Sequence, residues 1–142
     1  MDLVNKVTFA YDSIEEAFPP CDPGIEPFGS RLLVQIRTPK KKTAGGIILM
    51  AGGDAQETEF WAAQVAIVRA VGPLAFHNRN TLELWPEGSW CAVGDFVRVP
   101  KFGGDRFTVK IDDETEALIV VFNDLDIIGK ITGDPTKLKT YI

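Results

Sequence analysis

Apolar and polar residues alternate along several short stretches of the chain, and glycine or proline ends most of these stretches. Residues 31–37 (RLLVQIR) show the clearest alternation. A period of two residues is that of a β-strand, whose successive side chains point to opposite faces of a sheet. We therefore predict a half-buried strand at 31–37. Its core-facing side chains would be Leu32, Val34 and Ile36, and the opposite side would hold Leu33, Gln35 and Arg37.

Most of the remaining chain is also predicted to form short strands, because apolar runs rich in Val, Ile, Leu and Phe lie between turn residues. The acidic run 112–116 is suited to a hairpin connection, and residues 123–126 form a second polar turn. In residues 93–100 a turn is predicted at Gly94-Asp95, followed by a strand at 96–99. The further predicted strands are residues 62–71, 107–111, 117–122 and 127–131. Short strands joined by Gly/Pro turns indicate an all-β fold, a small antiparallel β-barrel or sandwich.

A helix is predicted only near the N-terminus. Ser13 and Glu16 have the spacing of a capping box, and Pro19-Pro20 would end the helix almost at once. The 142 residues suit one domain. We expect an N-terminal extension at 1–26 with this short helix, a barrel domain at 27–131 and a C-terminal tail at 132–142.

Composition narrows the class of function. The net charge of −5 and the lack of a basic surface beyond Lys40 to Lys42 argue against nucleic-acid binding. No apolar run approaches the roughly 18 residues that cross a bilayer, and the N-terminus has no secretory signal pattern. We therefore expect a cytoplasmic protein that binds no membrane. Cys21 and Cys91 are far apart in sequence and are expected to be reduced thiols.

No catalytic or metal-binding pattern is present. His77 is the sole histidine and lies in a polar stretch that offers no triad partner. Two separate cysteines and one histidine do not make a zinc site. The run 112–116 lacks the spaced ligands of a calcium loop, and no diglycine is followed by a phosphate-loop lysine. We expect no enzymatic activity, no metal and no cofactor.

The stretch 40–53 (KKKTAGGIILMAGG) places apolar residues between two diglycines. One interpretation is an ordinary core strand with a turn at each end. The other is an arm that offers apolar side chains to a partner. Glycines on both sides make the run costly to order, and with its polar flanks it is long for a loop without a function. Residue types alone leave both interpretations open.

Several motifs in order resemble the co-chaperonin family, the GroES or ten-kilodalton chaperonin class. Residues 25–36 (IEPFGSRLLVQI) resemble its opening strand, and 43–49 (TAGGIIL) resemble its mobile-loop motif SAGGIVL. Residues 66–72 (AIVRAVG) and 93–99 (VGDFVRV) are similar to GxVxAVG and VGDxVxF. Residues 117–131 match the spacing of its C-terminal hairpin and final strand. The resemblance implies a GroES-like β-barrel with a mobile loop at about 38–58 and a roof segment at about 73–92.

The chain departs from the family pattern in four places. Residues 1–26 are extra, and the roof segment 73–92 shares little with the family. Ser30 stands where the family commonly has Asp, and the region 102–106 also differs. Such divergence would suit a virus-encoded member acting in the host cytoplasm.

The resemblance implies a seven-subunit ring that caps a large GroEL-like chaperonin, which itself binds the ATP. Mobile loops dock on the chaperonin apical domains, displace substrate proteins and enclose them for folding. The docking residues carried over to this chain are Gly45, Gly46, Ile47, Ile48 and Leu49. The first strand would pair with the final strand of the neighbouring subunit. The implied subunit-interface residues are Phe28, Arg31, Leu33, Ile127, Ile128 and Ile131.

A single docking arm is expected to bind weakly. Burying three large aliphatic side chains stabilises by roughly 1.5–3 kcal/mol each, whereas ordering loop residues costs about 1–2 kcal/mol apiece. A ring that presents several arms raises the avidity by about two to four orders of magnitude.

Two other functions are compatible with a small β-barrel. A structural or virion barrel module could have inherited the fold and lost chaperonin binding, but the intact AGGIIL at 44–49 argues against that. Zinc-dependent medium-chain dehydrogenases contain a similar barrel, but this chain has neither their metal ligands nor room for a dinucleotide domain.

Overall fold

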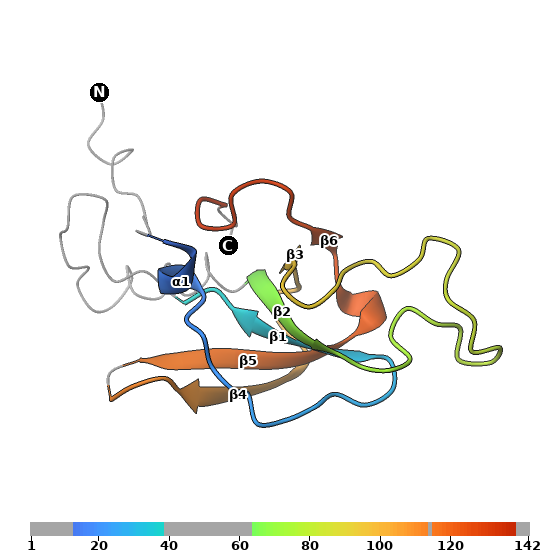
Figure 1. Cartoon of the computed structure of the whole chain (residues 1–142), viewed down its shortest axis with the longest axis horizontal. Coiled ribbons are helices and arrows are strands. Elements are labelled where there is room, and N and C mark those ends of the chain that lie inside the picture. The colour runs from blue at the N-terminus through green and yellow to red at the C-terminus, as the bar shows by residue number, and fades with distance from the viewer. Residues whose placement is uncertain (1–12, 39–63, 114, 139–142) are drawn as a thin grey trace.

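Six strands form one antiparallel sheet in the part of the chain that the computed structural model describes, residues 13–38, 64–113 and 115–138 (Figure 1). Their order across the sheet is β4-β5-β1-β2-β3-β6. One short α-helix and one 3-10 turn, η2, accompany them in these residues. The elements are α1 (Ile14–Ala17), β1 (Arg31–Ile36), β2 (Val65–Val71), β3 (Phe96–Arg98), β4 (Asp105–Lys110), β5 (Glu116–Asn123), η2 (Asp124–Asp126) and β6 (Gly129–Lys130). The predicted all-β class is confirmed.

Strand β1 is the centre of the sheet. It pairs with β2 on one side and with β5 on the other, and a register shift between Leu33 and Val34 interrupts its pairing with β2. Five of its six residues are buried. The prediction of a strand is confirmed, but the prediction that it is half-buried is wrong. Its second face is covered as well, so that Leu33, Gln35 and Arg37 are also buried.

The predicted hairpin is present as β4 and β5. Their register runs from Asp105 opposite Val121 to Lys110 opposite Glu116. The connection is closed by the Thr115 amide, which donates to the Asp112 carboxylate at 2.8 Å. A short polar side chain that accepts from a nearby amide is what an Asx-type turn requires, so the acidic run forms a turn as expected.

The predicted turn at Gly94-Asp95 is confirmed, and β3 follows it within one residue of its predicted range. The Ala92 amide donates to the Asp95 carboxylate at 2.9 Å, and Gly94 has a φ of 95°, so the chain turns there until residue 95. Strand β6 is shorter than the predicted range 127–131, because Ile127 caps η2. Ladder bonds nevertheless continue beyond β6, since the Ile131 amide donates to the Phe96 carbonyl at 2.8 Å.

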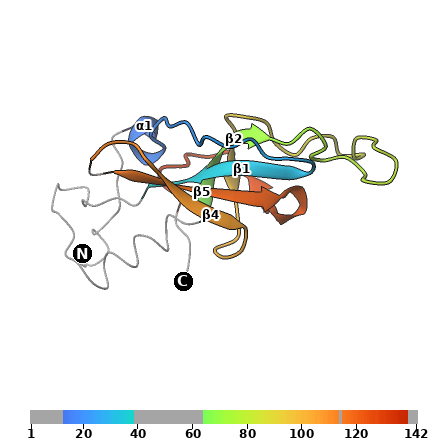
Figure 2. The same ribbon diagram turned by 90° about the horizontal axis from the view of Figure 1, so that it is seen from below.

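Helix α1 confirms the predicted helix. The Ser13 hydroxyl accepts a hydrogen bond from the Glu16 amide at 3.2 Å. The first amides of a helix have no partner within the helix, and this side chain gives one of them an acceptor. The helix ends at Ala17, two residues before Pro19. Figure 2 shows α1 lying against one side of the sheet rather than beyond its edge.

The main core lies on one face of the sheet and is closed by the roof segment, residues 73–92. Phe76, Trp85 and Trp90 pack together, with ring centroids 4.9–5.9 Å apart. The buried Asp124 carboxylate accepts from the Phe76 amide at 2.9 Å and so ties the roof to η2. In Figure 1 the roof continues past the end of the sheet. The buried side chains of this core come from β1, β2, β3, β5 and the roof, and include Leu32, Val34, Ile36, Val68, Phe76, Val97, Val120 and Phe122.

Candidate functional site: loop root and edge groove

The predicted docking residues, Gly45 to Leu49, lie outside the described residues. The structure does describe the two ends from which residues 39–63 leave the sheet. The Arg37 amide donates to the Val65 carbonyl at 2.8 Å, and the Val99 amide donates to the Gln64 carbonyl at 3.0 Å. Residues 39–63 therefore connect the adjacent ends of two paired strands, β1 and β2. We call Arg37, Thr38, Gln64 and Val65 the loop root.

A buried polar network lies next to the loop root. Gln35, which is fully buried on β1, donates from Nε2 to the Pro19 carbonyl at 2.8 Å. Its Oε1 accepts from Arg69 Nε at 2.8 Å and from the Cys21 thiol at 3.4 Å. Sequence reasoning missed this network because the polar position in an alternating strand indicated exposure. Arg69, in the otherwise apolar strand 65–71, was the one available signal that the sheet face of Gln35 has polar partners.

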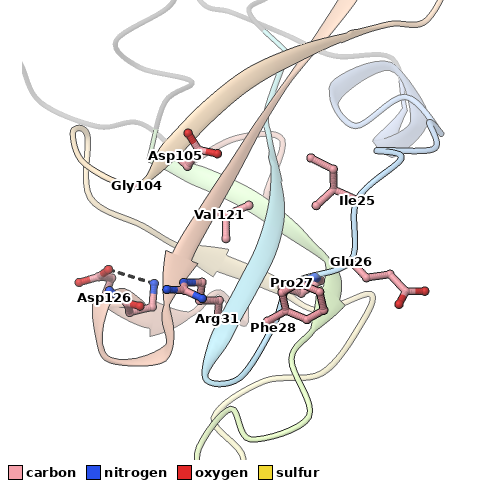
Figure 3. Close-up of a pocket in the computed structure, with 10 residues that line it drawn as sticks. Ile25, Glu26, Pro27, Phe28, Arg31, Gly104, Asp105, Val121 and Asp126 are labelled. Carbon is pink, nitrogen blue, oxygen red and sulfur yellow. Dashed lines mark hydrogen bonds between the residues drawn. The ribbon is translucent and has the colours of Figure 1, made fainter.

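A groove of about 440 Å³ lies at the other end of β1 from the loop root, next to Arg31. Figure 3 shows residues 25–28 on one side of it, Gly104 and Asp105 on the other, and Val121 of β5 between them. The Arg31 and Asp126 side chains lie at one end. Strand β4 is a sheet edge, paired on one side alone in the described residues. The lining is mixed, with Ile25, Pro27, Phe28 and Val121 beside Glu26, Arg31, Asp105 and Asp126. A groove beside an edge strand suits an extended chain that adds backbone hydrogen bonds.

The residues predicted at the subunit interface fall into two groups. Phe28, with 78% of its surface exposed, Arg31 and Ile128, with 58% exposed, lie on the surface. Leu33 and Ile127 are buried, and Ile131 packs partly into a cluster with the N-terminal extension.

Leu33 cannot contribute to an interface in the way predicted. Its side chain is buried within its own chain, and β1 is hydrogen-bonded along both edges. The segment that remains accessible to a neighbour precedes β1, near Phe28. The interface prediction therefore depends on Phe28, Arg31 and Ile128.

The two thiols have environments that suppress their reactivity. Burial, and secondarily the nearby Asp95 carboxylate, raise the pKa of Cys91 to about 11. Burial also raises the pKa of Cys21. Because the thiolate is the nucleophile and the metal ligand, both groups are largely protonated at neutral pH.

The remaining chemistry is sparse in the part of the chain that the structure describes. His77 Nδ1 is 2.8 Å from the Ala75 carbonyl of its own turn, which holds the ring at the backbone. Within the described ranges, no group of three or more His, Cys, Asp or Glu side chains could hold a metal ion. No described helix has the length and apolar character to span a membrane.

Comparison with known proteins gives consistent relatives. The sequence profile of the family described as "Chaperonin 10 Kd subunit" matches residues 24–131. The mitochondrial 10 kDa heat shock protein of Saccharomyces cerevisiae is 34% identical over 110 residues, covering 78% of this chain and 91% of the relative. Co-chaperonin GroES of Fervidobacterium nodosum is 36% identical over 107 residues, 75% of this chain and 96% of the relative. Co-chaperonin GroES of Francisella tularensis is 35% identical over 107 residues, 75% of this chain and 97% of the relative.

Proposed function

Because the chain belongs to the chaperonin 10 kDa subunit family, we propose that it is a co-chaperonin whose rings cap a GroEL-like chaperonin and enclose substrate proteins for folding. The observation that carries this proposal is the family match over residues 24–131, which spans nearly the whole length of the relatives and includes the segment TAGGIIL. Relatives of that length are named co-chaperonins.

Docking is assigned to Ile47, Ile48 and Leu49, with Gly45 and Gly46 allowing the turn beside them. The loop root supports this assignment. Residues 39–63 start and end at adjacent strand ends that are hydrogen-bonded to each other, Arg37 to Val65 at 2.8 Å. A docking loop attached in this way has a rigid base. A chaperonin that binds the loop would therefore hold the whole subunit through the sheet.

Ring formation is assigned to the exposed apolar surface at Phe28 and Ile128 and to the groove next to Arg31. A ring needs a heterologous interface, in which one surface of a subunit contacts a different surface of its neighbour. Phe28 lies on the groove, whereas Ile128 lies next to the other sheet edge, β6. Two separate apolar surfaces near opposite sheet edges meet that geometric need, and seven subunits is the proposed number.

The proposal is tested by replacing Ile48 with Asp. A charge at the centre of the docking tripeptide should not enter an apolar groove, because an unpaired buried carboxylate is strongly unfavourable. Wild-type protein should co-elute with a chaperonin on size exclusion when ATP is present, and the Ile48→Asp protein should elute alone at its normal oligomeric size.

Ile14→Asp is the matched control. Ile14 is 45% exposed and begins α1, where a negative charge is favourable. This variant should co-elute like the wild type. A wild-type protein that never co-elutes with a chaperonin would overturn the proposal and favour a structural module. An Ile48→Asp protein that caps normally would overturn the loop assignment alone.

A further inference from the structure

Two segments that lie outside the family match come together on one face of the sheet. The match covers residues 24–131, so the described residues 13–23 and 132–138 are additional to it. Ala17 and Phe18 of the first segment and Leu138 of the second belong to one apolar cluster with Val65 and Ile67 of β2. We call residues 17–21 and 134–138 the terminal clasp.

Phe18 is the apolar centre of the clasp. It is 2% exposed, and its ring lies 5.1 Å from the ring of Phe96 on β3. Ala17 beside it is fully buried. Apolar side chains buried this completely make the N-terminal segment an integral part of the folded domain rather than a free appendage.

Polar side chains of the sheet are matched to the same segment. Gln35 donates to the Pro19 carbonyl at 2.8 Å, and Arg69 Nη2 donates to the Phe18 carbonyl at 3.3 Å. A buried amide or guanidinium is costly unless it is hydrogen-bonded. The sheet therefore carries polar groups whose partners are carbonyls of residues that precede the family match.

The clasp holds consecutive residues of the loop root. The Thr38 amide donates to the Ala17 carbonyl of the N-terminal segment at 2.8 Å. Arg37 is 4% exposed and donates from Nη1 to the Pro135 carbonyl at 2.8 Å and to the Leu138 carbonyl at 2.7 Å. Each terminal segment therefore binds one of the last two described residues before the docking loop.

The tail turn that presents these carbonyls is itself fixed. The Asp134 carboxylate accepts from the Thr136 amide at 2.9 Å and from the Thr136 hydroxyl at 2.6 Å. Thr136 is buried, although Asp134 is exposed. The tail therefore has a local constraint that holds the Pro135 carbonyl toward Arg37.

We infer that the terminal clasp positions the docking loop: it fixes the direction in which the chain leaves β1 and thereby raises the affinity of the ring for its chaperonin. The inference rests on the proposed function. Its physical basis is pre-organisation, because a root that is already immobilised need not be ordered when the loop binds. Ala17, Phe18 and Arg37 are then positioning residues, acting through the root and not by contact with the chaperonin.

The test uses the full chain with Phe18→Ala, the conservative variant Phe18→Leu, and the control Ile14→Ala on the exposed side of the same helix. Amide hydrogen exchange of Thr38 should speed up by about tenfold or more in Phe18→Ala, because local opening exposes an amide whose carbonyl partner is released. Phe18→Leu should restore most of the protection, and Ile14→Ala should match the wild type.

The second arm measures the dissociation constant of the ring from a chaperonin in ATP, at a temperature where every variant is folded and oligomeric. Phe18→Ala should weaken binding by about tenfold, because small losses per subunit multiply over the arms of a ring. Arg37→Lys is a milder disruption that keeps the charge but loses the rigid planar guanidinium whose Nη1 reaches two carbonyls. It should also weaken binding, by about threefold.

The outcomes separate the two proposals. Unchanged Thr38 exchange in Phe18→Ala would overturn the clasp as an anchor of the root. Faster exchange with unchanged chaperonin affinity would make the clasp a purely structural element and overturn the positioning role. A wild-type protein that binds no chaperonin would overturn the proposed function, and the proposed effect of the clasp on docking would fall as well. The hydrogen-exchange result would still decide whether the clasp anchors Thr38.

Discussion

At the scale of single residues, burial decides behaviour that residue type leaves open. Gln35 and Arg37 occupy the polar positions of an alternating strand, yet both are buried and hydrogen-bonded to the terminal clasp. Cys91 is 5% exposed and faces the main core. A thiol in that position acts as a small apolar side chain, and ionisation would place a charge in the core.

Cys91 predicts an alkaline loss of stability. A pKa near 9 in the unfolded chain and about 11 in the folded one means that the folded state favours the neutral thiol. The contribution of the neutral Cys91 thiol to the free energy of unfolding is fully present below pH 9. It is lost as the pH rises from 9 towards 11. One pKa unit corresponds to about 1.4 kcal/mol, so this difference between the two states sets an upper limit of about 3 kcal/mol. Urea unfolding from pH 8 to 11 should show this loss in the wild type.

The Cys91→Ala protein is the reference for that measurement. It should be less stable at pH 8 because a buried side chain is shortened, but its stability should fall less steeply between pH 9 and 11. If the free energy of unfolding fell equally steeply with pH in the two proteins, Cys91 would have its ordinary pKa in the folded state, contrary to this prediction.

At the scale of elements, the contact between β1 and β2 depends on close backbone approach. The Gly72 amide donates to the Arg31 carbonyl at 2.8 Å, and the Leu74 amide donates to the Gly29 carbonyl at 2.9 Å. A Cβ atom at Gly72 would collide with the Gly29 carbonyl oxygen and lie 2.8 Å from that of Arg31. The glycine that ends the AIVRAVG motif is therefore required by packing between two strand ends.

Gly72→Ala should accordingly lower the free energy of unfolding by about 3 kcal/mol, the range of strained or overpacked substitutions. Gly133→Ala is the control, because no heavy atom lies within 4 Å of a Cβ built there. It should change stability by no more than about 0.5 kcal/mol. Equal midpoints for the two variants in chemical denaturation would contradict the close approach of the strands.

At the scale of the whole molecule, the exposed apolar residues mark where a single chain is incomplete. Phe28 is 78% exposed and Ile128 58% exposed, each near a different edge of the sheet. Unpaired edges and large exposed apolar side chains are features that oligomers cover. The proposed ring would bury both sites at one repeating interface.

Phe28→Asp and Ile128→Asp should therefore each shift the protein from rings to smaller species, because a carboxylate would be buried at every interface. Analytical ultracentrifugation measures the shift, and circular dichroism should show an unchanged fold. Ile14→Asp, an exposed apolar-to-acid change at a residue outside the predicted interface, should leave the ring intact. A ring of normal mass in both interface variants would contradict this assignment.

Local sequence was sufficient wherever a few neighbouring residues decide the structure. Period-two alternation located β1, the acidic turn located the β4–β5 hairpin, and the Ser13 cap located α1. It was insufficient for β6, because the first residue of the predicted strand, Ile127, caps the η2 turn instead. The docking tripeptide stays a prediction from its motif, because its residues lie outside the described ranges.

The sequence by itself determined the strand-rich fold class, the positions of the main turns and the resemblance that led to a co-chaperonin function, because periodicity, capping and motif spacing are encoded within a few residues. The tertiary structure alone decided that β1 is covered on both faces and that Leu33 faces the interior. It also brought together Arg37 and Pro135, which are 98 residues apart in the chain. Such contacts depend on how distant segments share one sheet face, and no local pattern carries that information.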